Sequence, residues 1–161
     1  MKKAQIALET MLYVSFFMIL LAFLSFYLLS NFKAELEKRE YLILRSLGEQ
    51  IAFKFFFVIN SIPPTDYSFT LPNLNYFNYN YELILSNNNG MLYFVAKEGN
   101  SRKTSFSYPL GFRNFVCAPV SCCTYDQTNN LLVVDLIAVK KINLNATYSA
   151  QKTKIEVRCL P

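Results

Sequence analysis

A run of twenty uncharged residues, from Met11 to Ser30, constrains this chain more than any other feature of its sequence. As an α-helix rising 1.5 Å per residue, the run would be about 30 Å long, which matches the hydrocarbon core of a bilayer. One carboxylate, Glu9, lies just before the run, and an ionised carboxylate deep in lipid costs at least about 2.5 to 3.5 kcal/mol. The sequence therefore predicts a membrane-crossing helix whose acidic residue needs a partner.

The residues around the run differ from an ordinary secretory signal. Such a signal has an apolar region of 7 to 15 residues followed by a cleavage site of small residues. Here the apolar run is longer, and residues 26–31 after it contain no such site. The small residue Ala4 lies before the run instead, directly after Lys2 and Lys3. A cut after Ala4 would leave the apolar helix on the mature chain, with Gln5 first and Glu9 fifth.

This arrangement resembles the class III signal peptide of archaeal type IV pilin-like proteins, over about the first thirty residues. The resemblance implies cleavage between Ala4 and Gln5 by a prepilin peptidase. It also implies that the new α-ammonium of Gln5, mostly charged at neutral pH, pairs with Glu9 of a neighbouring subunit. The family more often has glycine in place of Ala4 and serine in place of Ala7. The alternative is an uncleaved anchor whose Glu9 reaches the membrane surface.

The resemblance also implies a function. The chain would be a structural subunit, not an enzyme, of a type IV pilus-like surface filament for adhesion or surface attachment. It would assemble into a helical homo-oligomer through its hydrophobic helix, with the pilus assembly machinery of the membrane as partner. Lys2 and Lys3 predict a cytoplasmic N-terminus before processing, and the rest would become part of an extracellular filament. The alternative is a membrane-anchored extracytoplasmic binding domain that does not polymerise.

The helical pattern continues beyond the apolar run. Apolar residues recur at spacings of three, four and seven, which is typical of one face of a helix. These residues are Leu36, Ile43, Leu44, Leu47, Ile51, Phe55 and Val58. Pro63 and Pro64 predict the end of the helix near Asn60. The predicted organisation is a leader at 1–4, a hydrophobic transmembrane and assembly helix at 5–31, its amphipathic continuation at 32–60, and an extracytoplasmic β-rich head at 65–161.

Short β-rich segments separated by turn residues follow the helix. The turn Asn87-Asn88-Asn89-Gly90 lies between apolar runs at 79–86 and 91–97, and Asn-Gly between such runs predicts a β-hairpin. Further strands are predicted at 102–108, 131–139, 142–148 and 153–159, with 131–139 as the central buried strand. We therefore predict an α+β, type IV pilin-like fold, in which the long helix packs on one small antiparallel sheet of five or six strands.

Four cysteines, Cys117, Cys122, Cys123 and Cys159, all lie in the predicted head. Thiols exported from the cytosol tend to oxidise, so an even number predicts two disulfides. The favoured pairing joins Cys117 to Cys122 or Cys123 and joins the same loop to Cys159. The alternative, a zinc site, lacks the paired short spacings of structural zinc, and the chain has no histidine.

The composition also limits the chemistry of the head. Without histidine, no Ser/His or Cys/His catalytic pair exists, and we predict no catalytic residue, metal or cofactor. Asp135 interrupts an apolar strand and is predicted to face outward. The aromatic residues within 73–81 are predicted to be mainly core. Asn145 begins an Asn-Ala-Thr glycosylation acceptor.

The net charge of +5 is modest and spread along the chain. Removal of residues 1–4 takes away two lysines, which leaves 14 basic and 11 acidic residues and a net charge of +3. No long basic run is present, so we expect a solvated surface and no nucleic-acid partner.

The first prediction concerns the N-terminus. The protein recovered from its native membrane is expected to begin at Gln5 and to retain its apolar helix, as intact mass and N-terminal sequencing will show. A chain that still carries Lys2 and Lys3 would indicate a plain signal anchor. A start beyond Ser30 would contradict both interpretations.

Overall fold

The computed structural model describes residues 2–72, 74, 77–99, 101–118, 123–137, 139–149 and 152–160. Within them, one helix precedes nine strands, so the α+β class is confirmed. The chain divides into two compact units, Met1–Ile43 and Leu44–Pro161. Each unit is described by itself below, and the second is called the head.

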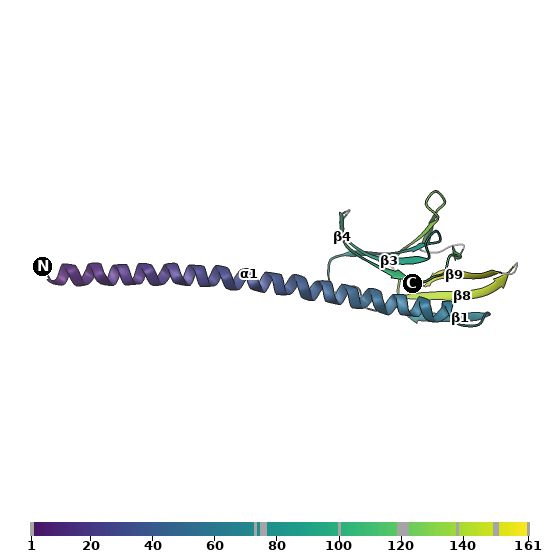
Figure 1. Cartoon of the computed structure of the whole chain (residues 1–161), viewed down its shortest axis with the longest axis horizontal. Helices are drawn as coiled ribbons and strands as arrows, with labels where there is room; N and C mark the ends of the chain where they lie inside the picture. Colours follow the sequence, from purple (N-terminus) through teal and green to yellow (C-terminus); the bar gives the residue numbers. More distant parts are fainter. Residues whose placement is uncertain are drawn as a thin grey trace. The chain divides into compact units, whose positions relative to one another are not determined.

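The helix α1 runs from Lys2 to Ile59 (Figure 1), as the sequence pattern predicts. In the first unit, the large apolar side chains described between Ile6 and Phe32 are all 42 to 76% exposed. A helix that is apolar on every side is stable only in apolar surroundings. Its length and composition are sufficient for it to cross a membrane.

The last turns of α1 belong to the head and bury one face. The buried residues of this face are at most 7% exposed: Leu44, Leu47, Ile51, Phe55 and Val58. Leu36 and Ile43 belong to the same apolar periodicity, but they precede Leu44, where the head begins, and are 50% and 41% exposed.

The end of α1 has a local cause. The side-chain amide of Asn60 donates a hydrogen bond to the Phe56 carbonyl (2.8 Å), and the hydroxyl of Ser61 donates one to the Val58 carbonyl (2.7 Å). The same two carbonyls also accept backbone hydrogen bonds from the Asn60 and Ser61 amides (3.2 Å each), so each side chain adds a second donor where the helical ladder ends. Pro63 and Pro64 follow and prevent continuation.

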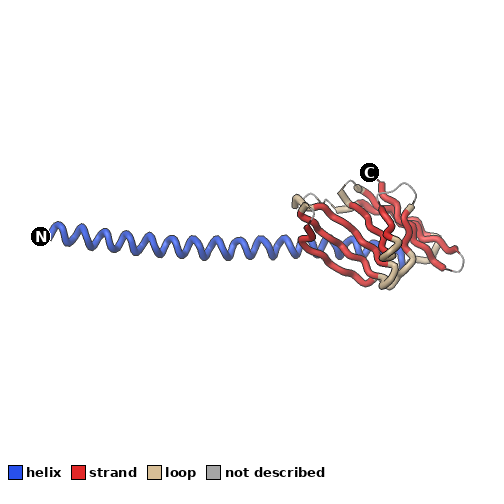
Figure 2. The backbone as a smooth tube through the Cα atoms, turned by 90° about the horizontal axis from the view of Figure 1, so that it is seen from above, coloured by secondary structure: helices blue, strands red, loops and turns tan. Residues whose placement is uncertain are grey.

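Nine strands form two sheets in the head (Figures 1 and 2). One sheet has the order β1-β8-β9-β5, and the other has the order β4-β3-β2-β7-β6. The strands are β1 (Thr65–Thr70), β2 (Asn80–Ser86), β3 (Met91–Glu98), β4 (Ser101–Pro109), β5 (Phe115–Cys117), β6 (Cys123–Asp126), β7 (Leu131–Asp135), β8 (Lys141–Ser149) and β9 (Lys152–Leu160). All described pairs are antiparallel except β5 with β9.

The hairpin predicted at the Asn-Gly turn is confirmed as β2 and β3. Tyr81 lies opposite Ala96 and Ser86 opposite Met91 across this pair. Gly90 adopts a positive φ of 67°, a conformation that glycine reaches without steric cost. The turn residues therefore fix the register of the two central strands of the five-stranded sheet.

Two predictions about the sheet are wrong. The head has two sheets, because β8 and β9 do not join β2, β3, β4 and β7 but pair with the edge strands β1 and β5, which the pattern did not reveal. The strand predicted at 131–139 ends at Asp135, and β7 lies next to the edge strand β6 instead of at the centre. Asp135 Oδ1 accepts a hydrogen bond from the Ile137 amide (3.0 Å), which stabilises a turn where the strand was expected to continue.

The helix contacts both sheets of the head. The Phe55 ring packs edge-on against Phe69 of β1 and Phe115 of β5, with ring centroids 6.2 Å apart in each pair. On the side of the five-stranded sheet, Tyr108 of β4 donates a hydrogen bond from its hydroxyl to the Arg45 carbonyl (3.0 Å). A Cβ on Gly48 would lie 2.5 Å from that hydroxyl. The glycine thus lets Tyr108 approach the helix.

The second prediction tests this core. Phe55→Ala is expected to lower the free energy of unfolding of the head by about 3 to 5 kcal/mol, because it removes a fully buried ring. Phe53→Ala on the same helix is the matched control, since Phe53 is 65% exposed. It should change the stability by less than about 1 kcal/mol. Thermal unfolding of the purified full chain in detergent measures both, and equal losses would contradict this packing.

Candidate assembly site

Glu9 is the carboxylate of the apolar part of α1, and its side chain is exposed. The backbone is helical through Ala4 and Gln5, but the side chains of these two residues lie outside the described part of the chain. Residues four apart lie on the same side of a helix, so Gln5 and Glu9 share one side. Among the described side chains, none forms an ion pair with Glu9.

The hydroxyls near Glu9 are satisfied within the helix. Thr10 Oγ1 donates to the Ile6 carbonyl and Ser15 Oγ to the Met11 carbonyl, each at 2.8 Å. Such bonds to the preceding turn let a hydroxyl lie in lipid without losing its hydrogen bond. A carboxylate accepts hydrogen bonds and has no corresponding way to bond the carbonyls of its own helix. Glu9 therefore needs a donor from elsewhere.

A charged stretch follows the apolar part of the helix. It contains two ion pairs between residues one helical turn apart, Glu35 with Arg39 (3.5 Å) and Arg45 with Glu49 (2.8 Å). All four side chains are more than half exposed, so each pair contributes little to stability. The stretch marks where α1 becomes compatible with water.

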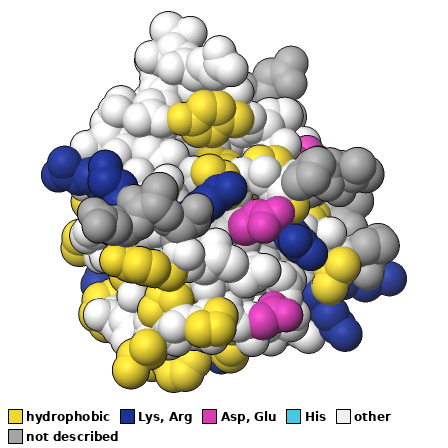
Figure 3. Space-filling model, turned by 90° about the vertical axis from the view of Figure 1, so that its right-hand side faces the viewer, with side chains coloured by type: hydrophobic (Ala, Val, Ile, Leu, Met, Phe, Trp, Pro, Cys, Tyr) yellow, Lys and Arg dark blue, Asp and Glu magenta, His cyan; other side chains and the backbone are white. Residues whose placement is uncertain are grey.

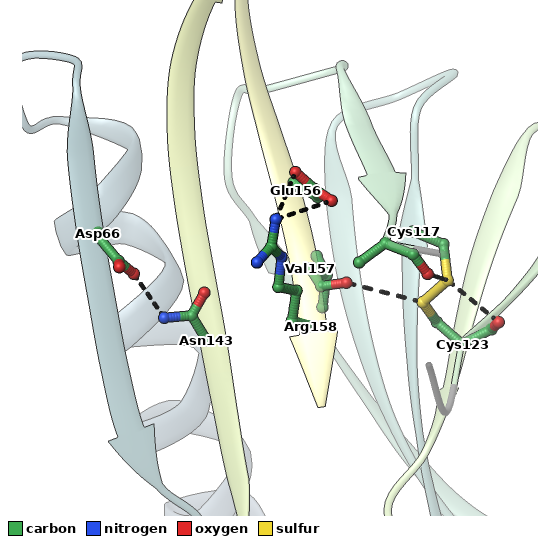
Figure 4. Close-up of polar contacts among 8 residues, drawn as sticks. Asp66, Cys117, Cys123, Asn143, Glu156, Val157 and Arg158 are labelled. Atoms are coloured by element: carbon green, nitrogen blue, oxygen red, sulfur yellow. Dashed lines mark hydrogen bonds and ion pairs between the residues drawn. A yellow bond between two sulfur atoms is a disulfide. The ribbon is translucent and has the colours of Figure 1, made fainter. Parts of the chain in front are cut away.

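A disulfide joins the two sheets of the head. It links Cys117 on β5 to Cys123 on β6, with Cα atoms 5.9 Å apart. It is one of the two loop pairings predicted from the sequence. Figure 4 shows the bond near β9, where Cys123 Sγ lies 3.8 Å from the Val157 carbonyl oxygen. Since β5 and β6 are edge strands of different sheets, the disulfide links an edge of one sheet to an edge of the other.

Cys159 on β9 is also disulfide-bonded. Cys122, the remaining cysteine, lies outside the described residues. The three described cysteines are therefore oxidised, which removes the thiolates that a zinc site would need. Among the described residues, no group of three or more His, Cys, Asp or Glu side chains is arranged to hold a metal ion.

A second link between the sheets is made by Asn87, at the end of β2. Its amide donates to the Phe115 carbonyl (2.9 Å), and its Oδ1 accepts from the Phe115 amide (2.9 Å). The side chain thereby pairs with β5 as a strand backbone would. Within the described part of the chain, the disulfide between Cys117 and Cys123 and this pair of hydrogen bonds both link the two sheets.

The outer face of the four-stranded sheet is polar. Asn143 on β8 donates from its amide to Asp66 of β1, and Arg158 pairs with Glu156 along β9 (Figure 4). The Asn143 amide also donates to the Ser68 hydroxyl of β1 (2.8 Å). Asn145, the glycosylation candidate, lies on β8 opposite Asp66 and Glu156 and is partly buried. A glycan on Asn145 would stand between the side chains of two neighbouring strands, and its modification stays a prediction.

Two acidic residues of the head, Asp126 and Asp135, stabilise turns. Asp135 is exposed, as predicted from its place in the strand pattern. Asp126, at the turn between β6 and β7, accepts hydrogen bonds from the side chain and the backbone amide of Asn129 and from the Thr128 amide. These hydrogen bonds lower the pKa of Asp126 below its ordinary value, and the bond from the Asn129 side chain has the largest effect. Both carboxylates shape backbone turns.

The aromatic segment 73–81 contributes to the core where it is described. Tyr81 is 2% exposed and stacks on Phe94, and Phe77 stacks on Tyr79 beside it. A hollow of about 360 Å³ borders these rings, lined also by Asn78 and Ile137. Asn73, Asn75 and Tyr76 of the same segment lie outside the described residues.

The sequence analysis missed an apolar surface on the outward side of α1 in the head. Phe53, Phe56 and Phe57 are 65%, 50% and 53% exposed. We call these three residues the aromatic ridge. Phe57 packs on Tyr67 of β1 with ring centroids 5.3 Å apart. The signal was present, since large aromatic residues occur off the face that the helical periodicity assigns to the core.

Protein-family models, curated proteins and solved structures give no match to this chain. The features of the chain that bear on function are the apolar helix with Glu9, the disulfide-bonded head and the aromatic ridge.

The third prediction concerns the disulfides. Replacing Cys117 and Cys123 by serine is expected to destabilise the head by about 2 kcal/mol, the value for closing a short loop. Thermal unfolding under oxidising conditions measures this, with oxidised wild-type protein as reference. Peptide mapping without reduction is expected to find Cys117 joined to Cys123 and Cys122 joined to Cys159. A peptide joining Cys117 to Cys159 would contradict this pairing.

Proposed function

We propose that this chain is a structural subunit of a type IV pilus-like filament. It is cut after Ala4 by a prepilin peptidase and assembled through the apolar part of α1. The observation that supports the proposal is the exposed Glu9 at the start of an exposed apolar helix, with no ion-pair partner among the described side chains. A plain anchor gains nothing from a carboxylate in that place.

The charge of Glu9 gives assembly a specific register. Cleavage before Gln5 creates an α-ammonium one helical turn from Glu9. In a low-dielectric environment, opposite charges attract strongly, whereas a lone charge is penalised. Pairing the ammonium of one copy with Glu9 of another removes both penalties at once. Because the attraction falls with distance, a pair between two copies favours the axial offset that brings the ammonium of one next to Glu9 of the other.

The head suits the outer part of a filament. Its core is closed by its own helix turns and two sheets. One face of the head carries basic, acidic and apolar side chains interspersed with each other (Figure 3). Such a mixed surface favours solubility. The two cross-sheet links would help the head withstand conditions outside the cell.

A second candidate is a membrane-anchored binding domain that does not polymerise. It is favoured by the compactness of the head, which needs no second copy to complete its core. In that case Glu9 would lie at the membrane surface, within reach of water. The two candidates differ in what the loss of the Glu9 charge does.

The fourth prediction separates them. Glu9→Gln in the full chain is expected to insert into the membrane and to keep the disulfide-bonded head. It should lower the fraction assembled into filaments at least about tenfold, which corresponds to about 1.4 kcal/mol or more per contact. Glu37→Gln is the matched control, since it removes an exposed carboxylate from the charged stretch of the same helix.

The measurement compares filaments sheared from cells and seen by electron microscopy with protein retained in the membrane. Assembly of Glu9→Gln at the wild-type level would contradict the filament and favour the anchored domain. Loss of assembly in Glu37→Gln as well would show that the helix does not tolerate charge changes in general.

A further inference from the structure

The aromatic ridge is the largest apolar surface of α1 within the head. Phe53, Phe56 and Phe57 follow the spacing i, i+3, i+4, so their rings form one ridge along the helix. A phenylalanine buries 150 to 250 Å² when it is fully covered, so three rings at these exposures leave roughly 300 Å² open. Contiguous apolar patches of this size on a soluble surface mark interaction sites.

The bilayer that holds α1 is a poor partner for the ridge. Eight charged residues lie between Lys33 and Glu49, and charged side chains remain outside hydrocarbon. Phe53 follows Phe32 by 21 residues, and such a span of helix rises about 30 Å, the thickness of a second hydrocarbon core. With residues 8–32 in lipid, the charged residues between them separate the ridge from the bilayer along the chain.

We propose that the aromatic ridge of one copy packs on the apolar segment 8–32 of α1 in another copy. This inference rests on the proposed function and names a contact within the filament. When a copy leaves the membrane, its apolar segment loses its lipid and needs apolar cover on every side. The ridge on the head of a neighbouring copy covers part of the apolar segment, and the segment in turn covers the ridge.

The shapes of the two surfaces fit. A row of large side chains at i, i+3 and i+4 packs into the groove between the rows of another helix. Ala22 and Ser25 provide a shallow place in the apolar segment, and both are exposed. Small residues there let a large side chain of a neighbour approach the backbone closely. Contact with Tyr67 holds the Phe57 ring in place, so little side-chain freedom is lost on docking.

The contact also has the symmetry that a filament needs. The ridge and the apolar segment are different surfaces of the same chain. A contact between two different surfaces repeats from copy to copy without closing, and it generates a helical filament unless the rotation closes a ring. A contact of the ridge with itself would stop at a dimer.

The fifth prediction maps this contact directly. Phe53 is replaced in the full chain by photo-reactive p-benzoylphenylalanine, which keeps the ring, and assembled filaments are irradiated and digested. The expected product joins the peptide around residue 53 to a peptide from residues 8–32 of another copy. The same probe at Ile137, which is 63% exposed on the head outside the ridge, is the control. It should give no such product.

A pair of variants gives the energetic test. Phe53→Gln with Phe56→Gln is expected to lower the assembled fraction about tenfold or more, as expected for buried aromatic contacts. Tyr125→Gln with Ile137→Gln removes two other exposed apolar side chains of the head and should change assembly less than about twofold. Circular dichroism and thermal unfolding establish that both double variants keep the folded head.

The outcomes separate this inference from the proposed function. If the wild-type chain forms no filament, both fall. If it forms filaments but the probe at Phe53 reacts with lipid, with another head or with nothing, the inference falls and the proposed function stands. Normal assembly of the folded Phe53→Gln, Phe56→Gln variant also overturns the inference.

Discussion

The packing of one helix face between two sheets is the interaction on which the head depends. Phe55 is fully buried and touches a ring from β1 and a ring from β5. Tyr108 reaches the same helix from β4, at the place where Gly48 leaves room for it. Each sheet alone would expose an apolar face. The helix covers part of both, so its last turns cannot be separated from the head without opening the core.

The two sheets need further links because each ends in a short edge strand. Strands of three or four residues, such as β5 and β6, form few ladder hydrogen bonds and are weak alone. The bond between Cys117 and Cys123 holds these two edges together. Asn87 adds a pair of hydrogen bonds to the backbone of β5. The junction between the two sheets is therefore stabilised by cross-links, whereas the packing of the helix on the sheets is stabilised by burial of apolar side chains.

An element was predicted from the sequence when the residues that determine it lie close together in the chain. The Asn-Gly hairpin and the helix end before Pro63 depend on neighbouring residues, and both were predicted correctly. The strands β1 and β5 exist through partners far along the chain, β8 and β9, so local patterns did not reveal them. Of the assembly site, the sequence pattern supplied Glu9 and its relation to Gln5. The helical periodicity identifies the buried face of α1 but not the aromatic ridge. A large aromatic residue outside that face, such as Phe53, is an equally informative sign of an exposed apolar surface.

Under the proposed function, one apolar segment serves two environments in succession. In lipid its side chains meet hydrocarbon, and in a filament they meet other copies, so simple burial of apolar surface favours neither state strongly. The preference for the filament then has to come from contacts that lipid cannot supply. A charge partner for Glu9 is one such contact. Cover for a ridge that lies beyond the membrane is another, because water surrounds the ridge before assembly, and the hydrophobic effect then acts in full.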